Sequence, residues 1–295
     1  MEANLRKESE NDENPEQAPS VPAPLPLSKN AQKKLLKRQK FESKKAERKA
    51  YIKKKKRDEI ERKRKEWEDK LSTMAEEERE AVISSRKKLR QERMAKRTEQ
   101  KDEKLSRLSN AKEKGINIII DLDFSNLMTS SEISSLTQQI MYCYAVNGRS
   151  KSPAHLWLTG CKGEIGDQLG KLPGFDKWVV EKESRAYNEA LGEQKSKLVY
   201  LTADSETTLE ELDSNDMYII GGLVDRNRWK GITMKKAEEQ GIRTAKLPIG
   251  SFVKLSSSQV LTVNQVVEII LKYGETGDWK TSFFEVIPPR KLQQV

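Results

Sequence analysis

The chain has few of the residues on which disulfide frameworks, zinc motifs and histidine-based catalysis depend. Its 295 residues include two cysteines, Cys143 and Cys161, and one histidine, His155. Two cysteines without a CxxC pair cannot form a disulfide framework or a common metal motif, and this usage fits a reducing intracellular compartment. His155 lies in an apolar run typical of a strand, so we expect a structural histidine and no Ser–His or Cys–His nucleophile.

Long apolar runs are also missing from the sequence. No stretch approaches the roughly 20 apolar residues that a membrane-spanning helix requires. The first residues are acidic and contain no hydrophobic segment, so the sequence predicts neither a secretory nor a mitochondrial presequence. We therefore expect no membrane partner.

Positive charge, in contrast, is abundant and is confined to one segment. Residues 29–114 contain 33 Lys and Arg against 17 Asp and Glu, whereas residues 1–28 carry a net charge of −4 and residues 115–295 one of −2. A basic block of this kind is typical of nucleic-acid binding, and a simple solvated helix is the alternative. A membrane surface is less favoured because the segment lacks a wide apolar face.

The basic segment is predicted to be helical. Residues 1–28 are rich in Glu, Asn and Pro and predict a disordered acidic tail. Residues 29–114 are nearly free of Gly and Pro, and they predict two long charged helices that break near residues 71–73. This basic segment, residues 29–114, is called the arm below. It carries RKRK at 62–65 and a second basic cluster, and the two could bind RNA or act as a nuclear-import signal. The second cluster consists of Lys53, Lys54, Lys55, Lys56 and Arg57.

After residue 114 the pattern changes to alternating strands and helices. The apolar runs predict strands at 116–121, 154–160, 177–180, 197–202, 217–224 and 243–249, and the helical spacings predict helices at 130–147, 233–241 and 263–275. Such alternation predicts an α/β domain over residues 115–290 with a mostly parallel sheet covered on both faces, followed by a short tail at 291–295.

Three loops of this domain follow apolar runs and contain glycine or polar residues. They lie within residues 199–205, 217–228 and 246–270. Gly221 and Gly222 lack a Cβ, which would let the backbone come close to a ligand, and charged residues follow them at once. Ligands of open α/β sheets bind at the carboxyl ends of strands. A tight turn explains an isolated Gly-Gly pair, but three such loops in one region predict a binding site.

These loops also carry a resemblance to a known family. YLTADS at 200–205, GGLVDRNR at 221–228 and LPIGSFVKLSSSQVLTVNQV at 247–266 are similar to the motifs of the tRNA guanine-9 N1-methyltransferases, most closely the fungal members. The resemblance covers roughly residues 115–290 and the basic segment before them. It implies a SPOUT-type domain, which is an α/β fold with a deep trefoil knot. It also implies S-adenosylmethionine as the cofactor, tRNA as the substrate, a monomeric enzyme, and a location in the nucleus and cytoplasm.

The resemblance implies a cofactor site made by the three loops. For the aliphatic members of this set, ordinary core packing is the alternative interpretation. The residues that it places against the cofactor are Leu201, Thr202, Gly221, Gly222, Arg226, Asn227, Arg228, Trp229, Leu247, Pro248, Ile249, Gly250, Leu261, Thr262, Val263 and Val266. No metal ion is implied.

Methylation of guanine at N1 requires the removal of a proton, because that nitrogen is protonated at neutral pH. Asp225 stands where the family places its proposed base. The alternative is a carboxylate that pairs with Arg226 or Arg228. Asp121 and Asp123, which end the first predicted strand, are second candidates. Adenine N1 has a free lone pair and needs no base, so Asp225 favours guanine as the target; the alternative is a methyltransferase that also accepts adenine at position 9.

Cations of the domain could extend the RNA-binding surface of the arm, and surface solubility is their alternative role. The candidates are Arg149, Arg185, Lys235 and Arg243, with Lys151 and Lys236 beside them. Of the tryptophans that could stack on bases, Trp157 and Trp178 are better explained by burial. The competing hypothesis for the whole chain is a non-catalytic RNA-binding or ribosome-assembly protein.

Overall fold

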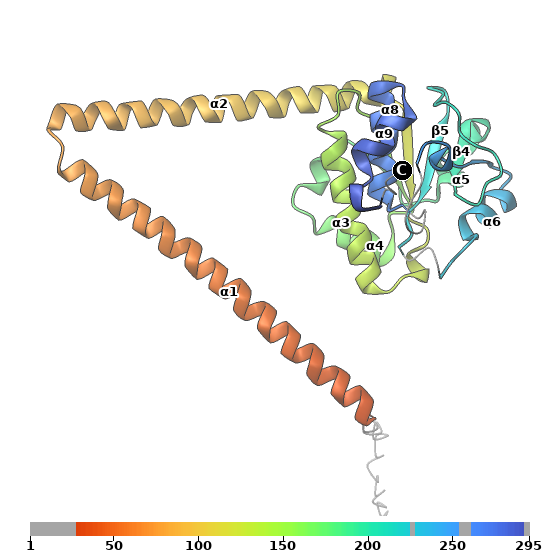
Figure 1. Ribbon diagram of the computed structural model, residues 1–295, viewed down its shortest axis with the longest axis horizontal. Coiled ribbons are helices and arrows are strands. Elements are labelled where there is room, and N and C mark those ends of the chain that lie inside the picture. The colour runs from red at the N-terminus through yellow and green to blue at the C-terminus, as the bar shows by residue number, and fades with distance from the viewer. Residues whose placement is uncertain (1–27, 225–227, 254–260, 292–295) are drawn as a thin grey trace, which may run out of the picture. The chain divides into compact units, whose positions relative to one another are not determined.

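The computed structural model describes residues 28–224, 228–253 and 261–291 (Figure 1). The chain divides into two compact units, residues 1–87 and residues 88–295. Within the described residues, no helix is long and apolar enough to cross a membrane.

The first unit consists of α1 (Lys29–Ser72) and the beginning of α2 (Glu76–Lys114). The interruption between them confirms the break predicted near residues 71–73. Charged pairs at i,i+4 stabilise these exposed helices, as in Glu59 and Lys63, whose side chains lie 2.9 Å apart. The stability of the helices therefore depends on local spacing and on residues with high helix propensity, because almost no side chain is buried.

The second unit contains one six-stranded sheet in which every pairing is parallel. The spatial order is β3-β2-β1-β5-β4-β6. The strands are β1 (Asn117–Asp121), β2 (His155–Thr159), β3 (Glu181–Lys182), β4 (Leu198–Leu201), β5 (Met217–Gly221) and β6 (Arg243–Ala245). This arrangement confirms the predicted parallel α/β class.

Helices cover both faces of the sheet, as its strand sequences require. Alternate residues of the central strands point to opposite faces, so Ile118 and Ile120 pack in one buried cluster and Ile119 in another. The first face is covered by α3 (Ser130–Asn147), α4 (Gly163–Gly170) and α8 (Val263–Thr276). The second is covered by α5 (Tyr187–Ala190) and α6 (Ile232–Glu239) (Figure 1). Two further helices, α7 (Ile249–Phe252) and α9 (Trp279–Val286), pack together beside α8.

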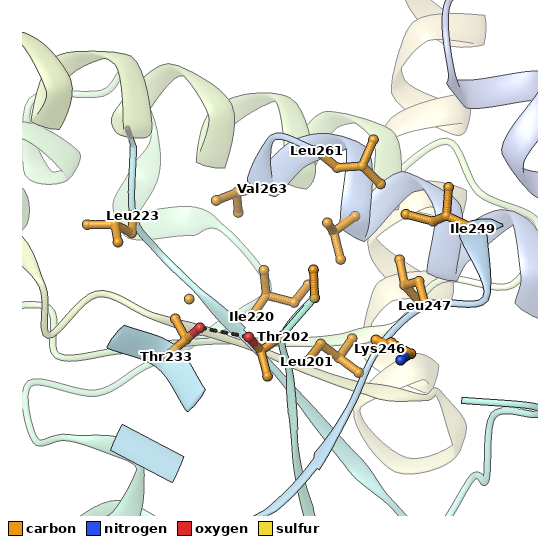
Figure 2. Close-up of a pocket in the computed structure, with 13 residues that line it drawn as sticks. Leu201, Thr202, Ile220, Leu223, Thr233, Lys246, Leu247, Ile249, Leu261 and Val263 are labelled. Carbon is orange, nitrogen blue, oxygen red and sulfur yellow. Dashed lines mark hydrogen bonds between the residues drawn. The ribbon is translucent and has the colours of Figure 1, made fainter. Parts of the chain in front are cut away.

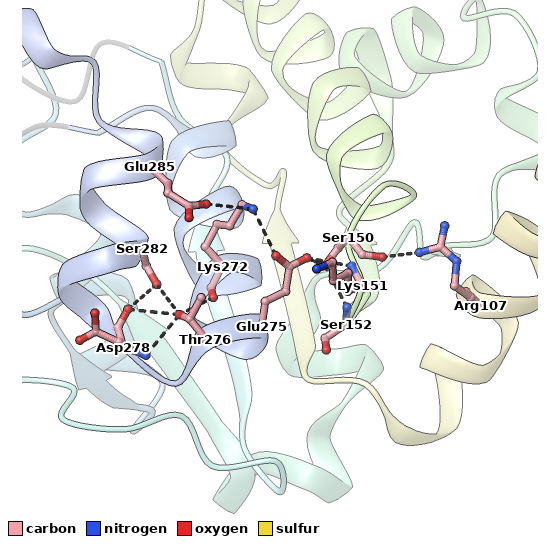
Figure 3. Close-up of polar contacts among 10 residues, drawn as sticks. All are labelled: Arg107, Ser150, Lys151, Ser152, Lys272, Glu275, Thr276, Asp278, Ser282 and Glu285. Carbon is pink, nitrogen blue, oxygen red and sulfur yellow. Dashed lines mark hydrogen bonds and ion pairs between the residues drawn. The ribbon is translucent and has the colours of Figure 1, made fainter.

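The end of α2 packs with the hydrophobic core of the second unit. Leu108 and Ala111 are buried, and the Arg107 guanidinium donates to the carbonyl oxygens of Gly148 and Ser150. The Ser150 hydroxyl in turn donates to Glu275 on α8 at 2.6 Å, so this set of hydrogen bonds extends from α2 to α8 (Figure 3). The predicted boundary at residues 114 and 115 therefore follows residues that already pack with the domain.

Three strand predictions differ from the structure. The strand expected at 177–180 is wrong: residues 175–177 form a 3-10 turn, and the indole ring of Trp178 stacks on Tyr144 with centroids 4.2 Å apart. The strand expected at 243–249 ends at Ala245, because Lys246 forms only an isolated bridge with Thr208 and helix α7 begins at Ile249 after Pro248. The strand expected at 217–224 ends at Gly221.

Candidate functional site

A pocket lies at the carboxyl ends of β4, β5 and β6 (Figure 2). β1 and β5 are neighbours although the chain runs from β1 outward to β2 and β3 before it returns to β4 and β5. Strand order therefore reverses beside β5, and ligands of open α/β sheets bind at such a point. The pocket is lined by Leu201, Thr202, Ala203, Ile220, Gly221, Leu223, Thr233, Lys246, Leu247, Ile249, Leu261, Val263 and Val266.

The lining combines many aliphatic side chains with a few polar groups. The hydroxyls of Thr202 and Thr233 lie 3.0 Å apart and join the end of β4 to α6. Lys246 is the cation among the described lining residues. Apolar walls with a small number of polar groups suit a largely apolar, planar ligand whose orientation is fixed at its edges.

Gly221 and Gly222 are required by the protein's own packing. A Cβ on Gly222 would lie 2.7 Å from the Asp121 carbonyl oxygen, and one on Gly221 would lie 2.8 Å from the Thr233 methyl carbon. The Gly222 N–H donates to that same carbonyl oxygen at 2.8 Å. Atoms of the protein itself therefore favour glycine at both positions, and contact of their backbone with a cofactor stays a prediction. Gly221 nevertheless lines the pocket.

Eight of the sequence-predicted cofactor residues come together in this pocket. They come from three separate segments of the chain and are Leu201, Thr202, Gly221, Leu247, Ile249, Leu261, Val263 and Val266. Asp225, Arg226 and Asn227 lie outside the described residues, so the structure gives no position for the predicted base.

Other predicted residues lie near the pocket without lining it, among them Gly222, Pro248 and Gly250. Thr262 caps α8, and its hydroxyl and amide face Asn264 and Gln265. The Arg228 guanidinium pairs with Glu132 at 2.9 Å. Trp229 is half-buried, and its buried indole N–H has no hydrogen-bond partner in the described part of the chain.

The two second-rank acids lie in different environments. Asp121 is fully buried, and its carboxylate accepts hydrogen bonds from Lys236 at 2.8 Å and Tyr200 at 2.9 Å. Burial raises the pKa of Asp121, and the lysine and tyrosine oppose that rise. The Asp123 side chain is partly exposed and lies 3.2 Å from the Lys162 ammonium. Asp121 is therefore shielded from solvent, and its contacts suit it to holding α6 against β1.

His155 lies at the opposite, amino-terminal end of β2. Its Nε2 lies 3.2 Å from a carboxylate oxygen of Glu181, and burial lowers the pKa of the imidazole against the opposing effect of Glu181. This contact ties β2 to β3, as expected of a structural histidine.

The predicted RNA-binding cations of the domain differ in their partners. Arg185 pairs with Glu183, Arg243 with Asp216 and Lys235 with Glu239. Exposed Arg149 has no ion pair with the described residues. Burial lowers the pKa of Lys104, and repulsion from Arg149 and Arg107 adds to this effect. Lys236 faces Asp121 and is not part of an exposed basic surface.

Five lining residues were missed by sequence reasoning, namely Ala203, Ile220, Leu223, Thr233 and Lys246. Lys246 immediately precedes the LPIG motif, so an extension of that motif by one residue would have found it. Thr233 has no comparable signal, because only the packing of α6 against β4 brings it to the pocket.

Comparison with known proteins gives a consistent result. The sequence model of the family described as tRNA (guanine(9)-N(1))-methyltransferase TRM10/TRM10A matches residues 25–292. The chain is 43% identical over 178 residues to tRNA methyltransferase 10 homolog A of Rattus norvegicus, a match that covers 60% of this chain and 52% of the relative.

A second relative is the tRNA (guanine(9)-N1)-methyltransferase of Schizosaccharomyces pombe, which is 40% identical over 190 residues, or 63% of this chain and 62% of the relative. The matches thus span about half to three fifths of the curated relatives' length. Among solved structures, the spTrm10(Full length)-SAH complex is 43% identical with a TM-score of 0.55, and the match covers 59% of this chain and 95% of that one.

Proposed function

We propose a function from one premise: the chain belongs to the tRNA (guanine(9)-N(1))-methyltransferase TRM10/TRM10A family. On this premise the chain transfers a methyl group from S-adenosylmethionine to N1 of guanine at position 9 of tRNA. The observation that carries the proposal is the pocket itself, because eight residues selected by the family motifs meet there from three separate segments. A protein that only bound RNA would not need this pocket.

The pocket has the chemistry that the adenosyl group of the cofactor requires. Leu201, Leu247 and Val266 belong to its aliphatic walls, and Thr202 and Thr233 supply hydroxyl groups at its edge. Lys246 offers a positive charge for the carboxylate of the methionine part. When bound, S-adenosylmethionine supplies an activated methyl group, so the protein mainly has to align the acceptor nitrogen with that methyl.

The remaining chemical task is the removal of the guanine N1 proton. We assign it to Asp225, which follows β5 by four residues in the loop between β5 and α6. Asp121 is unsuitable because it is fully buried against Lys236 and Tyr200. Asp123, which is partly exposed at the same edge of the sheet, is the second candidate.

The basic helices serve to bind tRNA in this proposal. A base stacked inside folded tRNA has to leave its stack to reach the pocket, and phosphate contacts elsewhere can offset that cost. We further propose that the chain acts as a monomer with a SPOUT-type knot. It works in the nucleus and cytoplasm, and the cluster at residues 53–57 is the motif that supports nuclear import.

Methyl transfer from labelled S-adenosylmethionine tests the proposal directly. Two tRNA transcripts are compared that differ only in carrying G or A at position 9, and the modified nucleoside is identified. Label in N1-methylguanosine alone supports both the reaction and the base choice, whereas label on both transcripts weakens the assignment of Asp225. Bound tRNA without any label would favour a non-catalytic RNA-binding protein.

The base assignment has its own test in the variant Asp225→Asn. We expect a lower rate of methyl transfer together with an unchanged affinity for S-adenosylmethionine, because the amide keeps the size of the carboxylate and cannot accept the proton. Unchanged turnover would remove Asp225 from this role.

A further inference from the structure

One face of α1 combines cations with exposed aromatic rings. Its members recur at alternating intervals of four and three residues, a spacing that places side chains on the same side of a helix. We call this set the basic–aromatic face; it consists of Lys37, Phe41, Lys44, Arg48, Tyr51 and Lys55. At 1.5 Å of rise per residue it extends over about 27 Å. The rings of Phe41 and Tyr51 are each 67% exposed.

The cations of this face have no ion-pair partner among the residues that the structure describes. The two acids nearest to them in sequence are engaged elsewhere, since Glu42 pairs with Arg38 at 3.2 Å and Glu47 accepts a hydrogen bond from Ser43 at 3.1 Å. No described carboxylate forms an ion pair with any of the four cations of the face. The Glu59 carboxylate pairs with Lys63, and Lys55 contributes only a weaker attraction to it without forming an ion pair.

The following segment, residues 58–86, which we call the elbow, uses its charges differently. Its ion pairs join Glu59 to Lys63, Arg62 to Glu66 and Arg64 to Glu68. It also contains the half-buried side chains of this unit, which are Trp67, Leu71, Met74 and Val82. The Arg86 guanidinium lies 4.0 Å from the centroid of the Trp67 ring. Four cations of the elbow thus contact partners within the elbow itself, namely Arg62, Lys63, Arg64 and Arg86.

We propose that the basic–aromatic face binds RNA, with its cations on phosphates and the rings of Phe41 and Tyr51 stacked on unpaired bases. Cations on a regular face bind a phosphate backbone with little regard to sequence, and exposed rings provide stacking platforms for bases. A membrane surface fits less well, because two separated rings form no continuous apolar stripe. This inference rests on the proposed function, and it divides the basic arm into a binding face and a structural elbow.

Salt-dependent binding of tRNA to the full chain tests the division. The variant Lys44→Gln/Arg48→Gln removes one lysine and one arginine from the face, and Arg62→Gln/Lys63→Gln removes the same two residue types from the elbow. Glutamine preserves helix propensity. We expect the face variant to lower the slope of log K against log salt by about two, since each phosphate contact contributes close to one. We expect the elbow variant to leave the slope unchanged.

The rings are tested by Phe41→Leu/Tyr51→Leu, which keeps apolar bulk and removes the aromatic faces. We expect tRNA affinity to fall by about 30-fold or more, the effect of losing two stacked bases, with no change in the salt slope. The matched control is Leu36→Ala/Ile60→Ala, which removes exposed apolar side chains from outside the face and should leave affinity unchanged.

The outcomes separate this inference from the proposed function. If the full chain binds and methylates tRNA but the face and elbow variants lose equal affinity, the inference fails and the proposed function stands. Binding of the full chain to vesicles of anionic phospholipid that the face variant loses, with tRNA affinity unchanged, would also overturn it in favour of a membrane surface. Binding of tRNA without methylation would overturn the proposed function alone, and failure of the full chain to bind tRNA would overturn both.

Discussion

The two units of the chain obtain their structure in opposite ways. In the first unit, nearly all side chains are exposed, and the helices are held by residue propensity and by local ion pairs such as Glu59–Lys63. In the second unit, the central strand β1 has Ile118, Ile119 and Ile120 fully buried between two layers of helices.

The contrast predicts which property a substitution in each unit should change. Side chains on the exposed helices contact few other residues, so their replacement should change partner affinity with little effect on folding. Side chains in the sheet and around the pocket contact many others, and their replacement should change stability or cofactor affinity first.

The largest expected effect comes from breaking the buried ion pair between Lys236 and Asp121. Lys236→Met leaves a fully buried carboxyl group without its cation, and we expect a loss of about 3–5 kcal/mol in the free energy of unfolding. The neighbouring exposed lysine provides the control, since Lys235→Met removes only a surface pair at 3.7 Å and should cost less than about 1 kcal/mol. Urea denaturation of both variants measures the difference, and equal midpoints would contradict it.

The next effect concerns the end of α2. Arg107→Ala removes two hydrogen bonds from the guanidinium to the carbonyl oxygens of Gly148 and Ser150. We expect a loss of about 1.5–3 kcal/mol, the usual range for hydrogen bonds to charged groups. Arg97→Ala, on an exposed part of the same helix, should have almost no effect. If the two variants unfold at the same urea concentration, the end of α2 is not anchored as described.

A smaller effect is expected inside the pocket. Val266→Phe adds an aromatic ring to the lining, and we expect affinity for S-adenosylmethionine to fall by about tenfold or more because the ring takes up ligand space. Affinity for tRNA should remain unchanged. Ile83→Phe, at an exposed position on α2, is the control. Calorimetric titration with the cofactor distinguishes them, and unchanged affinity in Val266→Phe would place the cofactor elsewhere.

The smallest effect is a pH dependence at Glu275. Burial acts to raise the pKa of this carboxyl group, but the Ser150 hydroxyl, the Lys151 amide and Lys272 outweigh burial and lower it. A carboxyl group whose pKa is lower in the folded state stabilises the fold above its unfolded pKa of about 4.3, and this contribution is lost as the pH falls through the folded pKa.

Glu275→Gln should therefore lower stability at pH 7 by about 1 kcal/mol, the usual contribution of a hydrogen bond. It should also reduce the loss of stability between pH 5 and pH 3, because the variant has no carboxylate at this position to protonate. Glu285→Gln removes a more exposed partner of Lys272, so its pH profile should follow that of the unchanged chain. Urea denaturation across this pH range measures both variants. Parallel profiles for Glu275→Gln and the unchanged chain would contradict the prediction.

Much of the fold could be predicted because its signals are local. The apolar spacing and the start of α3 are visible in the sequence, and the predicted bounds of 130–147 match the helix. β3 could not be predicted, because two residues carry no periodicity and pairing with β2 alone defines the strand. Helices α4 and α9 were also missed.

Residues of the site could be predicted from the sequence only where they lie in a family motif that also lines the pocket. Leu201, Leu247 and Val266 were found because they lie in or beside the loops that follow apolar runs. Thr233 was missed because its role depends on how α6 packs. Gly222 was predicted for a ligand, although a Cβ there would meet the Asp121 carbonyl oxygen. Sequence shows that a glycine is needed at such a position, but only packing shows which atom requires it.

The most direct test of the division between the two units is to measure both affinities on two proteins, the full chain and a variant that lacks residues 1–84. The deletion removes α1 and leaves the pocket and its anchors intact. We predict that affinity for tRNA at physiological salt falls by at least about 100-fold, because the phosphate contacts of the first unit are lost, while affinity for S-adenosylmethionine stays the same. Equal tRNA affinity in the two proteins would contradict the account.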